Sequence, residues 1–381
     1  MRSAYDRLPR SVRLYEDARQ EVTRDLLRRV NRRWPREAPQ DPAGWFARNA
    51  GGYATDVTMA QLEAALLSEW SVDNALAAQG MEVRDAPRTN PIGFASTDAA
   101  GRPVMGQAYA SAGLVGGTVD AVREAGGDVA AARALAWRRA GNSLALATQT
   151  ILSDTSRSVK AARMLAQDTG WVRVLTPPSC PRCVVTAGKY HREATADFDR
   201  HPGCDCTQMP TRDEYPDWAV DARQHFDSLT EDEQNVTFGM AAARAIRDGA
   251  DPAQVINARR GMSTTTDRFG YRRVATTEGT TKRGWASRYL RENYNASLKK
   301  QPGSRYRRMD RPRLTPEEIY RIAGDDRDLA MSLLHKNGYY LDASPGLTGR
   351  QSHYPRDREL QEAAARANER MKRRGVTPTR T

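Results

Sequence analysis

The chain begins with a stretch in which apolar side chains recur every three or four positions, with arginines between them. Residues 1–34 therefore predict one basic helix whose apolar face docks on a neighbouring helix. We expect its arginines, Arg19 among them, to point to solvent. Pro35 and Pro39 interrupt the pattern and predict the end of this helix. The predicted apolar face consists of Leu14, Ala18, Val22, Leu26 or Leu27, and Val30.

A second helix is predicted over residues 57–79, and Gly80 is expected to end it. Its large apolar side chains fall on one side, which predicts that they pack inward. The loop that follows, residues 84–104, is rich in proline, and Ile92 and Phe94 are expected to pack against the helices. The large side chains of the predicted inner face are Met59, Leu62, Leu66, Trp70 and Leu76.

Residues 107–168 are rich in alanine and predict helices in two or more pieces. The glycine pairs at 116–117 and 126–127 are the expected joints, and Asp128 is placed to cap the helix that follows the second pair. Small side chains allow helices to approach closely, so we expect a tightly packed helical layer here. The pattern changes to alternation at residues 171–175, which predicts a short strand.

The second half of the chain predicts shorter elements. Trp218 and Phe226 are the expected anchors of an acidic interval, and a short helix is predicted over residues 237–248. Residues 261–281 predict an extended loop or a hairpin, and Thr315 is expected to cap the first of two small helices. The fold class is thus predicted to be mainly α. The predicted regions are 1–106 (helical), 107–210 (core, with a small β-hairpin or knuckle at 171–210), 211–281 (connecting helices and loop), 282–345 (basic arm and helical pair) and 346–381 (charged tail).

All four cysteines of the 381-residue chain lie within residues 171–210. They form a Cys-x-x-Cys pair and a Cys-x-Cys pair, and a histidine stands three residues before the second pair. A tight turn that carries Cys-x-x-Cys aims both sulfurs at one tetrahedral metal ion. The spacing therefore predicts a structural zinc ion that staples the knuckle, with the four-cysteine set favoured among five candidates. The candidate ligands are Cys180, Cys183, His201, Cys204 and Cys206.

Other uses of clustered cysteines stay open at this stage. Two disulfides would suit a secreted domain, but the chain opens without a signal peptide. A redox Cys-x-x-Cys opens a helix in a βαβ unit, and a Cys–His nucleophile needs one activated thiol rather than four together. His191 is expected on the surface, and Asp205 adds negative charge to the site. The basic residues that offset this charge in part, or else belong to a solvated surface, are Arg182, Lys189, Arg192 and Arg200.

The residues around the cysteines resemble a known family. The run Gly170-Trp-Val-Arg-Val174 leads into Pro-Ser-Cys-x-x-Cys, and an Ala-Gly-Lys-Tyr segment and a closing Arg-His-Pro-x-Cys-x-Cys follow. This arrangement is similar to the MuF-like minor head proteins of tailed bacteriophages, in the version carried by phages and prophages of actinobacteria. The resemblance extends upstream through Asn90-Pro-Ile-Gly-Phe-Ala and Gly101-Arg-Pro-Val to Asp154-Thr-Ser-Arg157, and it covers about half of the chain.

This resemblance implies a structural protein of the capsid interior near the portal, and not an enzyme. The implied partners are the portal protein and capsid or scaffold proteins, and the implied location is the virion, after assembly in the host cytoplasm. The alternative from another class is a zinc-containing nuclease or other nucleic-acid-processing protein. Against that alternative, no set of His, Asp and Glu stands at the spacing of a metal-dependent hydrolase. A glycine-rich phosphate loop is also missing from the sequence.

Charge adds one further expectation. The chain has 59 Lys and Arg against 47 Asp and Glu, a net charge of +12, and no apolar run long enough to cross a bilayer. Its mean hydropathy of −0.72 suits exposed helices rather than one large core. Residues 282–313 hold eleven of the basic residues and two acidic ones, with four aromatic residues between them.

Such a segment is typical of chains that follow phosphates, so we expect it to contact DNA without sequence preference. The alternatives are an acidic portal or capsid surface as its partner, or a solvated face without one. The basic residues are Lys282, Arg283, Arg288, Arg291, Lys299, Lys300, Arg305, Arg307, Arg308, Arg311 and Arg313.

Overall fold

The computed structural model divides the chain into two compact units, residues 1–228 and 229–381, and each is described by itself. The boundary falls inside the segment 211–281 that the sequence predicts as a connection. Within the described part of the chain, no helix is long and apolar enough to cross a membrane. Arg311 and the predicted tail at 346–381 lie outside the described residues. The structure describes residues 5–175, 179–266, 272–300, 302–303, 305–310 and 312–340.

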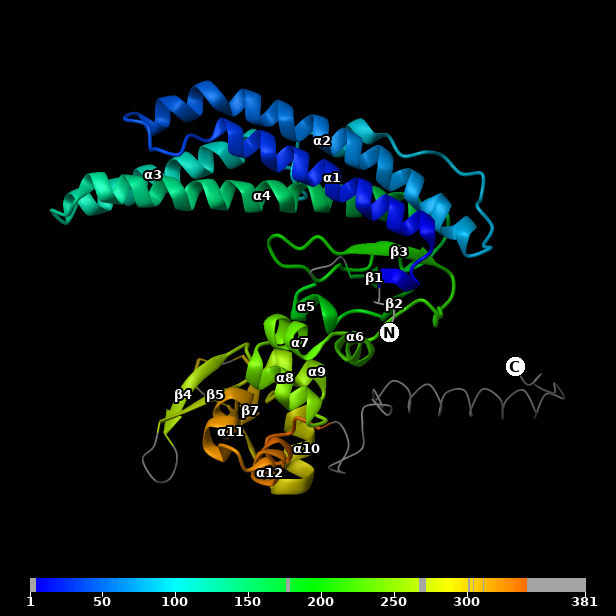
Figure 1. Cartoon of the computed structure of the whole chain (residues 1–381), viewed down its shortest axis with the longest axis vertical. Coiled ribbons are helices and arrows are strands. Elements are labelled where there is room, and N and C mark those ends of the chain that lie inside the picture. The colour runs from blue at the N-terminus through cyan, green and yellow to red at the C-terminus, as the bar shows by residue number, and fades with distance from the viewer. Residues whose placement is uncertain are drawn as a thin grey trace. The chain divides into compact units, whose positions relative to one another are not determined.

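The first unit is built on four long helices, in agreement with the predicted mainly helical class (Figure 1). α1 packs along α2, α2 packs on α3 and α4, and α3 and α4 form an antiparallel pair joined by a tight turn (Figure 1). The helices are α1 (Arg10–Arg33), α2 (Pro42–Ala78), α3 (Met105–Glu124), α4 (Val129–Ala166), α5 (Pro181–Val184) and α6 (Ala222–Ser228), with 3-10 turns at Tyr5–Arg7 and Pro91–Phe94.

Helix α2 differs from its prediction in both length and orientation. It begins at Pro42, because the Asp41 side chain accepts a hydrogen bond from the Gly44 amide and proline is tolerated in a first turn. Its buried face includes many small residues, and of the large side chains predicted to point inward Met59, Leu66 and Trp70 are exposed, whereas Leu76 is buried as expected. Small residues occupy this face because α2 is packed between α1 and the α3–α4 pair, where backbones approach closely.

Helix α1 buries the predicted face at Val22, Leu26 and Val30 and departs from the prediction in its first half. The buried positions include Tyr15, Arg19, Val22 and Leu26, whereas Leu14 is 51% exposed. The expectation that Arg19 faces solvent is wrong, since its side chain is buried against Glu16 of the same helix. A pattern that counts only apolar residues misses a buried ion pair.

The remaining predictions for the first unit have mixed outcomes. Asp128 caps α4 through its side chain, as expected, and the joint between α3 and α4 falls at Gly126, whose φ is +68°. Helix α3 runs through the glycine pair at 116–117 without a break, contrary to expectation. Ile92 is 71% exposed rather than packed on the helices.

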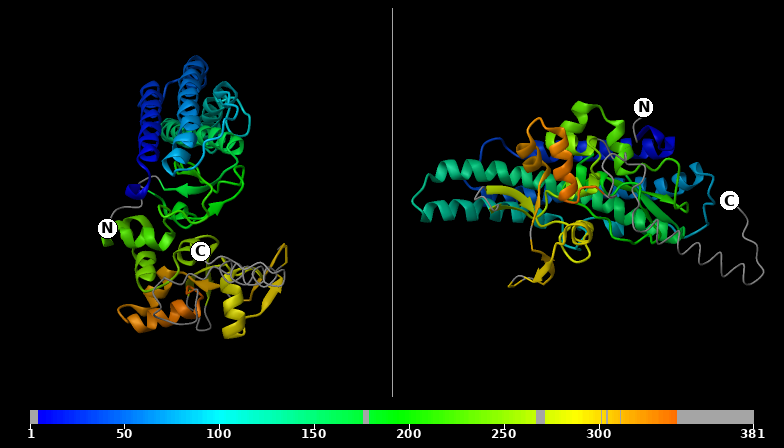
Figure 2. Two further views of the ribbon diagram at one scale, coloured as in Figure 1. Left: turned by 90° about the vertical axis from the view of Figure 1, so that its right-hand side faces the viewer. Right: turned by 90° about the horizontal axis from the view of Figure 1, so that it is seen from below.

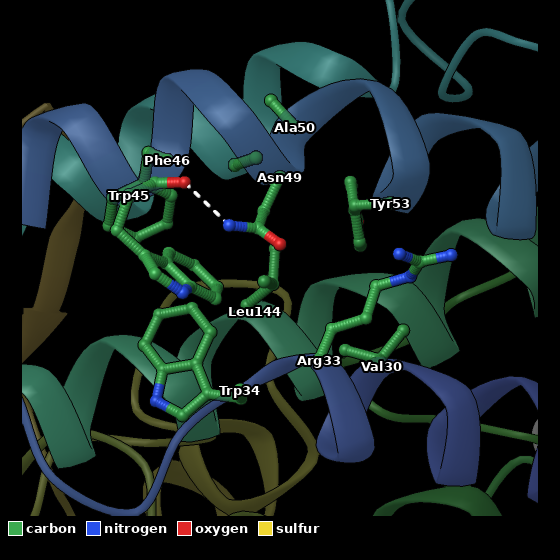
Figure 3. A pocket seen from close by; sticks show the side chains of 10 residues that line it. Val30, Arg33, Trp34, Trp45, Phe46, Asn49, Ala50, Tyr53 and Leu144 are labelled. Atoms are coloured by element: carbon green, nitrogen blue, oxygen red, sulfur yellow. Dashed lines mark hydrogen bonds between the residues drawn. The ribbon is translucent and has the colours of Figure 1, made fainter.

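Aromatic side chains fill one end of the helical layer (Figure 3). Trp34 stacks on Trp137 with ring centroids 4.2 Å apart, and Trp45 and Phe46 meet both indoles edge-on or tilted. Gly141 is required at this place, because a Cβ there would lie 2.8 Å from the Trp34 ring nitrogen. The cavity beside these rings has a volume of about 10 Å³, room for one water molecule at most, so we treat the cluster as core.

A three-stranded antiparallel sheet lies beside the helices, with strand order β2-β1-β3 (Figure 2). β1 pairs with β3 from Gly170↔Thr211 to Val174↔Thr207, which confirms the strand predicted at 171–175. Every residue of β1 and β3 is buried, because β3 lies against α2 and α4 and the sheet side chains Val172, Val174 and Met209 pack with Leu8, Val12, Ala75 and Trp218. The strands are β1 (Gly170–Val174), β2 (Tyr190–His191) and β3 (Thr207–Thr211).

The second unit combines short helices with two small β structures. The predicted hairpin at 261–281 is present as β4 and β5, and β8 extends the sheet on the β5 edge. Thr315 caps α11 as expected, whereas the helix predicted at 237–248 is divided at Gly239, whose φ is +85°. The elements are α7 (Glu231–Phe238), α8 (Met240–Arg247), α9 (Pro252–Asn257), β4 (Met262–Thr266), β5 (Arg272–Thr276), α10 (Trp285–Tyr294), β6 (Leu298–Lys300), β7 (Arg307–Met309), β8 (Arg313–Leu314), α11 (Pro316–Ala323) and α12 (Arg327–Lys336).

Candidate metal site

Two turns of the chain bring the five predicted ligands together. Cys180 is the N-cap of the short helix α5, and its sulfur accepts a hydrogen bond from the Cys183 amide at 3.4 Å. Pro181 occupies the first turn of α5, where its missing amide hydrogen costs nothing. His201 and the second cysteine pair lie in the loop that leads into β3. The structure at Cys180 and Cys183 therefore agrees with the turn that the Cys-x-x-Cys spacing predicts.

The donor atoms form two groups that share one residue. Cys180, Cys183 and His201 make one group, and Cys183, Cys204 and Cys206 make the other, with the donor atoms of each group within 4.8 Å of one another. The Cys183 sulfur lies 3.4 Å from that of Cys204 and 3.7 Å from the His201 Nε2. Both groups can hold a metal ion, and Cys183 is their common member.

The imidazole of His201 is held in a defined orientation. Its Nδ1 lies 2.9 Å from the Pro202 carbonyl oxygen, and its Nε2 lies 2.9 Å from the Cys180 sulfur. A proton on Nδ1 that bonds to a carbonyl leaves Nε2 free to act as a metal ligand. Although burial lowers the pKa of His201, the Pro202 carbonyl and the Cys180 thiolate raise it by more.

Hydrogen bonds among the thiols distribute their protons unevenly. The bond to Cys180, followed by those to Cys204 and Cys206, raises the pKa of the Cys183 thiol. The same contact lowers the pKa of Cys180 to about 5, and contacts with Cys183 and Cys206 lower the pKa of Cys204. Thiolates are the form that binds metals, so the lowered pKa values of Cys180 and Cys204 favour binding of a metal ion.

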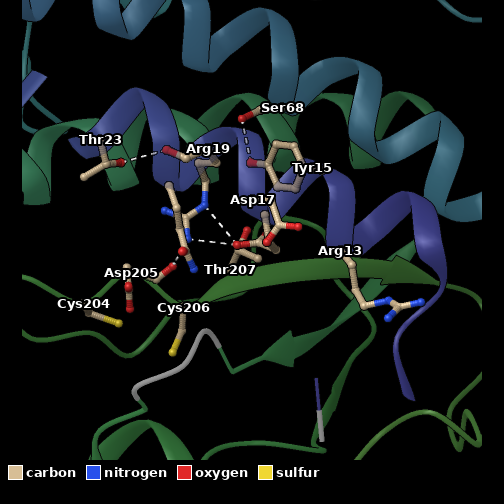
Figure 4. Close-up of polar contacts among 12 residues, drawn as sticks. Arg13, Tyr15, Asp17, Arg19, Thr23, Ser68, Cys204, Asp205, Cys206 and Thr207 are labelled. Atoms are coloured by element: carbon tan, nitrogen blue, oxygen red, sulfur yellow. Dashed lines mark hydrogen bonds and ion pairs between the residues drawn. The ribbon is translucent and has the colours of Figure 1, made fainter. Parts of the chain in front are cut away.

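The turn that carries the second cysteine pair is held by cations from the helices. Arg157 of α4 donates to the carbonyl oxygens of Cys204 and Cys206 at 2.6 and 2.7 Å. Arg19 of α1 donates to the Asp205 carbonyl at 2.7 Å, and Figure 4 shows its side chain pointing from the helix to this turn. An irregular buried turn has no strand partner for its carbonyls, so these side chains supply the donors.

A third cation, Arg173, joins the first cysteine pair to the sheet. Arg173 of β1 places its Nη1 3.8 Å from the Cys183 sulfur, and its guanidinium lies 3.8 Å from the centre of the Phe198 ring. The Arg157 guanidinium lies 4.6 Å from the centre of the same ring. Two buried positive charges are thus close to the thiols, where they offset negative charge.

From the sequence, we expected other basic residues to offset the negative charge of the thiolates. Arg182, Lys189, Arg192 and Arg200 are exposed, and Arg200 pairs with Asp154 at 2.7 Å. The closer cations, Arg157 and Arg173, were missed. The available signal was the Arg157-x-x-Lys160-x-x-Arg163 spacing, which puts three charges on one face of an alanine-rich helix. His191 stacks on the Trp171 ring at a centroid distance of 3.9 Å and is only half-buried.

The predicted basic arm is an ordered part of the second unit in its described residues. It contains α10 and the two-stranded ribbon β6–β7. The expectation that Arg313 contacts a partner is wrong, because its buried guanidinium donates to the carbonyls of Glu278, Asn337 and Gly338. Arg288, Arg291 and Arg308 are half-buried. The exposed members of the predicted set are Lys282, Arg283, Lys299, Lys300, Arg305 and Arg307.

Comparison of the chain with protein-family models, with curated proteins and with solved structures found no match.

Proposed function

We propose that the knuckle binds one zinc ion through Cys180, Cys183 and Cys204, with His201 or Cys206 in the fourth place. The observation that carries this proposal is the membership of Cys183 in both donor groups. A single ion bound to the Cys183 sulfur would lie close to all four of the other candidate ligands. Tetrahedral zinc with ordinary bond lengths holds its ligand atoms roughly 3.5–3.8 Å apart. The separations of 3.4 and 3.7 Å around Cys183 are close to that spacing.

The two candidates for the fourth place are supported by different observations. The Nδ1 contact of His201 with a carbonyl oxygen is the arrangement that orients an imidazole for a metal. Cys206 is the more deeply buried donor, and the sequence spacing favours four cysteines. His201→Ala and Cys206→Ala, each compared with wild type by elemental analysis, decide between them, because only the true ligand costs zinc when it is removed.

A structural role for this zinc fits the donor set better than a catalytic one. Cys183, Cys204 and Cys206 are buried, so the ion would be surrounded by sulfur and protein rather than by water. When bound, zinc would crosslink the α5 turn to the turn before β3. Arg157 and Arg19 in turn tie the second of these turns to the helices, and Lys160 ties the start of β3 to α4.

We further propose that the protein is a non-enzymatic component of a phage head, similar to the MuF-like minor head proteins. Segments that carry this resemblance are distant in sequence but meet at the knuckle. Arg157 and Asp154 belong to the upstream Asp-Thr-Ser-Arg segment. Arg157 binds the carbonyls of Cys204 and Cys206, and Asp154 pairs with Arg200, the arginine of the closing Arg-His-Pro-x-Cys-x-Cys segment. Their joint contribution to one structure supports the resemblance.

The proposed partners are the portal protein and capsid or scaffold proteins, with the virion interior as the final location. Exposed apolar side chains on α2 support a protein partner, since Met59, Leu66 and Trp70 recur at the spacing of one helix face. Co-expression with the portal, scaffold and major capsid proteins of the same phage genome tests this proposal. We expect the chain in purified procapsids, and its absence from them would overturn the head-protein role.

The nuclease alternative makes a different prediction. The purified protein is expected to leave plasmid DNA intact, with or without added divalent ions. Metal-dependent nicking that disappears on His201→Ala or Asp205→Asn would instead assign the knuckle to catalysis.

A further inference from the structure

The ribbon β6–β7 carries basic residues directly opposite one another. In its antiparallel register, Lys299 faces Arg308 and Lys300 faces Arg307. Residues 298–310 contain five Lys or Arg against one acidic residue, Asp310, a net charge of +4. In the two views of Figure 2 the ribbon, coloured gold, projects from the edge of the second unit.

These cross-strand pairs work against the fold of the ribbon. Like charges directly opposite each other on one face of an antiparallel pair are destabilising. Among the residues that the structure describes, neither Lys300 nor Arg307 forms an ion pair with a carboxylate. A single charged face can be a solvated surface. Two successive like-charge pairs at the tip of a ribbon are better explained by an anionic partner that relieves the repulsion.

The two pairs lie on opposite faces of the ribbon. Side chains two apart in a strand share a face, so Lys300 and Arg307 lie on the same face as Leu298 and Met309. Leu298 and Met309 pack in a cluster with Tyr289 and Leu290 of α10, which fixes the base of the ribbon. Beyond that base, Lys300 and Arg307 are exposed on this face and Lys299 is exposed on the other, where Arg308 is half-buried and donates to the Thr277 carbonyl at 3.5 Å. Arg305 and Tyr306, both exposed, follow in the turn.

A partner with phosphates on one side alone would engage only one of these faces. The major groove of B-form DNA is wide enough for a two-stranded ribbon, and phosphates line both of its walls. We propose that the β6–β7 ribbon binds double-stranded DNA by entering the major groove and contacting phosphates on both walls without reading the sequence. This inference goes beyond the head-protein role and does not depend on it.

The rest of the basic segment contributes unequally to this surface. The bridge between Thr281 and Arg308 places Lys282 and Arg283 beside the ribbon, where both are exposed. Arg291 donates to the Ser287 carbonyl of its own helix, and Arg313 is buried. The DNA contact is therefore assigned to the ribbon and its base rather than to the whole segment 282–313.

The test measures binding of the full-length protein to a short labelled DNA duplex of mixed sequence by fluorescence anisotropy. Salt is varied between about 50 and 200 mM, because each neutralised phosphate contributes about 0.9 to the slope of log affinity against log salt. Lys300→Ala combined with Arg307→Ala is expected to reduce the slope by about two and to weaken binding at least about tenfold at the lower end of this range. The matched control, Arg138→Ala with Arg139→Ala, removes the same charge from exposed positions on α4 and is expected to leave the slope unchanged.

Duplex RNA of the same sequence separates groove entry from general attraction to anions. The major groove of A-form RNA is deep and narrow, so we expect clearly weaker binding than to DNA. Equal affinity for the two duplexes, or equal losses in the ribbon variant and the α4 control, would overturn the proposal. Competition by a poly-glutamate peptide as strong as that by DNA would also overturn it, in favour of an acidic protein surface. Zinc content and procapsid incorporation are measured separately, so failure here is distinguishable from failure of the proposed function.

Discussion

Basic side chains stand in opposite surroundings in the two units. In the first unit, Arg157 and Lys160 are buried; Arg157 donates to the carbonyls of Cys204 and Cys206, and Lys160 donates to the carbonyl of Gln208 in β3. In the second unit, Lys300 and Arg307 are exposed and face each other across a ribbon. The buried cations donate hydrogen bonds to backbone carbonyls that would otherwise lack a donor. The exposed cations repel each other and so destabilise the ribbon that carries them.

The role of a cation in this protein is therefore decided by its partner and not by how many cations stand near it in the sequence. A buried cation that satisfies carbonyls is needed for folding, and its removal leaves unpaired acceptors. An exposed pair of like charges weakens folding slightly and becomes favourable only with an anion. Substitutions in the two units should therefore have opposite signs on stability, and the following predictions test this in order of decreasing effect.

The largest effect is expected from Cys183→Ser. Because Cys183 belongs to both donor groups, its loss should abolish zinc binding at either ligand set. The knuckle should then lose its structure while the four long helices persist, since structural zinc supplies folding free energy to small elements. Elemental analysis together with far-ultraviolet circular dichroism checks this. A Cys183→Ser protein that still holds one zinc per chain would contradict the proposed site.

The next effect concerns Arg157→Met, which keeps the length of the side chain but removes its donors. Two buried carbonyls lose their partner, and Asp154 loses one of its two arginines, so the first unit should lose about 3–5 kcal/mol of unfolding free energy. Chemical denaturation measures the loss. Arg138→Met, at an exposed position of the same helix, is the control and should change stability by less than about 0.5 kcal/mol.

Lys160 gives a prediction about pH. Burial, with help from Arg19 and Arg157, lowers the pKa of Lys160 to about 7, against the opposing effect of Glu16. The unfolded chain keeps this proton up to about pH 10.4, so it binds more protons than the folded chain between the two values. The contribution of Lys160 to stability is therefore lowest below pH 7 and rises with pH in this window.

Lys160→Met removes this dependence. The free energy of unfolding of wild type, minus that of Lys160→Met, should increase between about pH 7 and pH 9. Lys282→Met, at an exposed position, should show no such trend relative to wild type. A difference that stays constant or falls with pH would contradict a lowered pKa for this lysine.

The metal ligands and the helix caps could be predicted from the sequence, whereas the role of the buried cations could not. The clustering of the ligands followed from spacing, because a Cys-x-x-Cys turn is a local structure. Helix starts at Asp128 and Thr315 followed from side-chain caps for the same reason. The role of Arg157 did not follow, because its partners are carbonyls 47 and 49 residues further along the chain. A backbone carbonyl carries no residue-specific signal.

The inner face of α2 was missed for a related reason. Periodicity ranks large apolar side chains as core, so Met59 and Trp70 were placed inside. The structure buries Ala60, Ala64 and Ser68 instead, since a helix surrounded by others packs best through small residues. Similarly, the total charge of residues 282–313 predicted an interaction surface but not which members are exposed. Arg307 lies in the β6–β7 ribbon and is exposed, whereas Arg313 lies in β8 and is buried, which becomes visible only in the structure.

The smallest effect is expected from Lys300→Glu, and it gives the sharpest test of the comparison because two measurements should move in opposite directions. A glutamate at this position faces Arg307 and replaces a like-charge pair by an opposite-charge pair. Cross-strand pairs of opposite charge contribute about 0.2–1 kcal/mol, so the second unit should become more stable by an amount in this range. DNA affinity should fall, because a carboxylate then faces the phosphates. Lys300→Gln is the control, with a smaller change of the same sign in both measurements. If Lys300→Glu lowers stability and affinity together, Lys300 supports the ribbon as Arg157 supports the knuckle, and the contrast between the two units is lost.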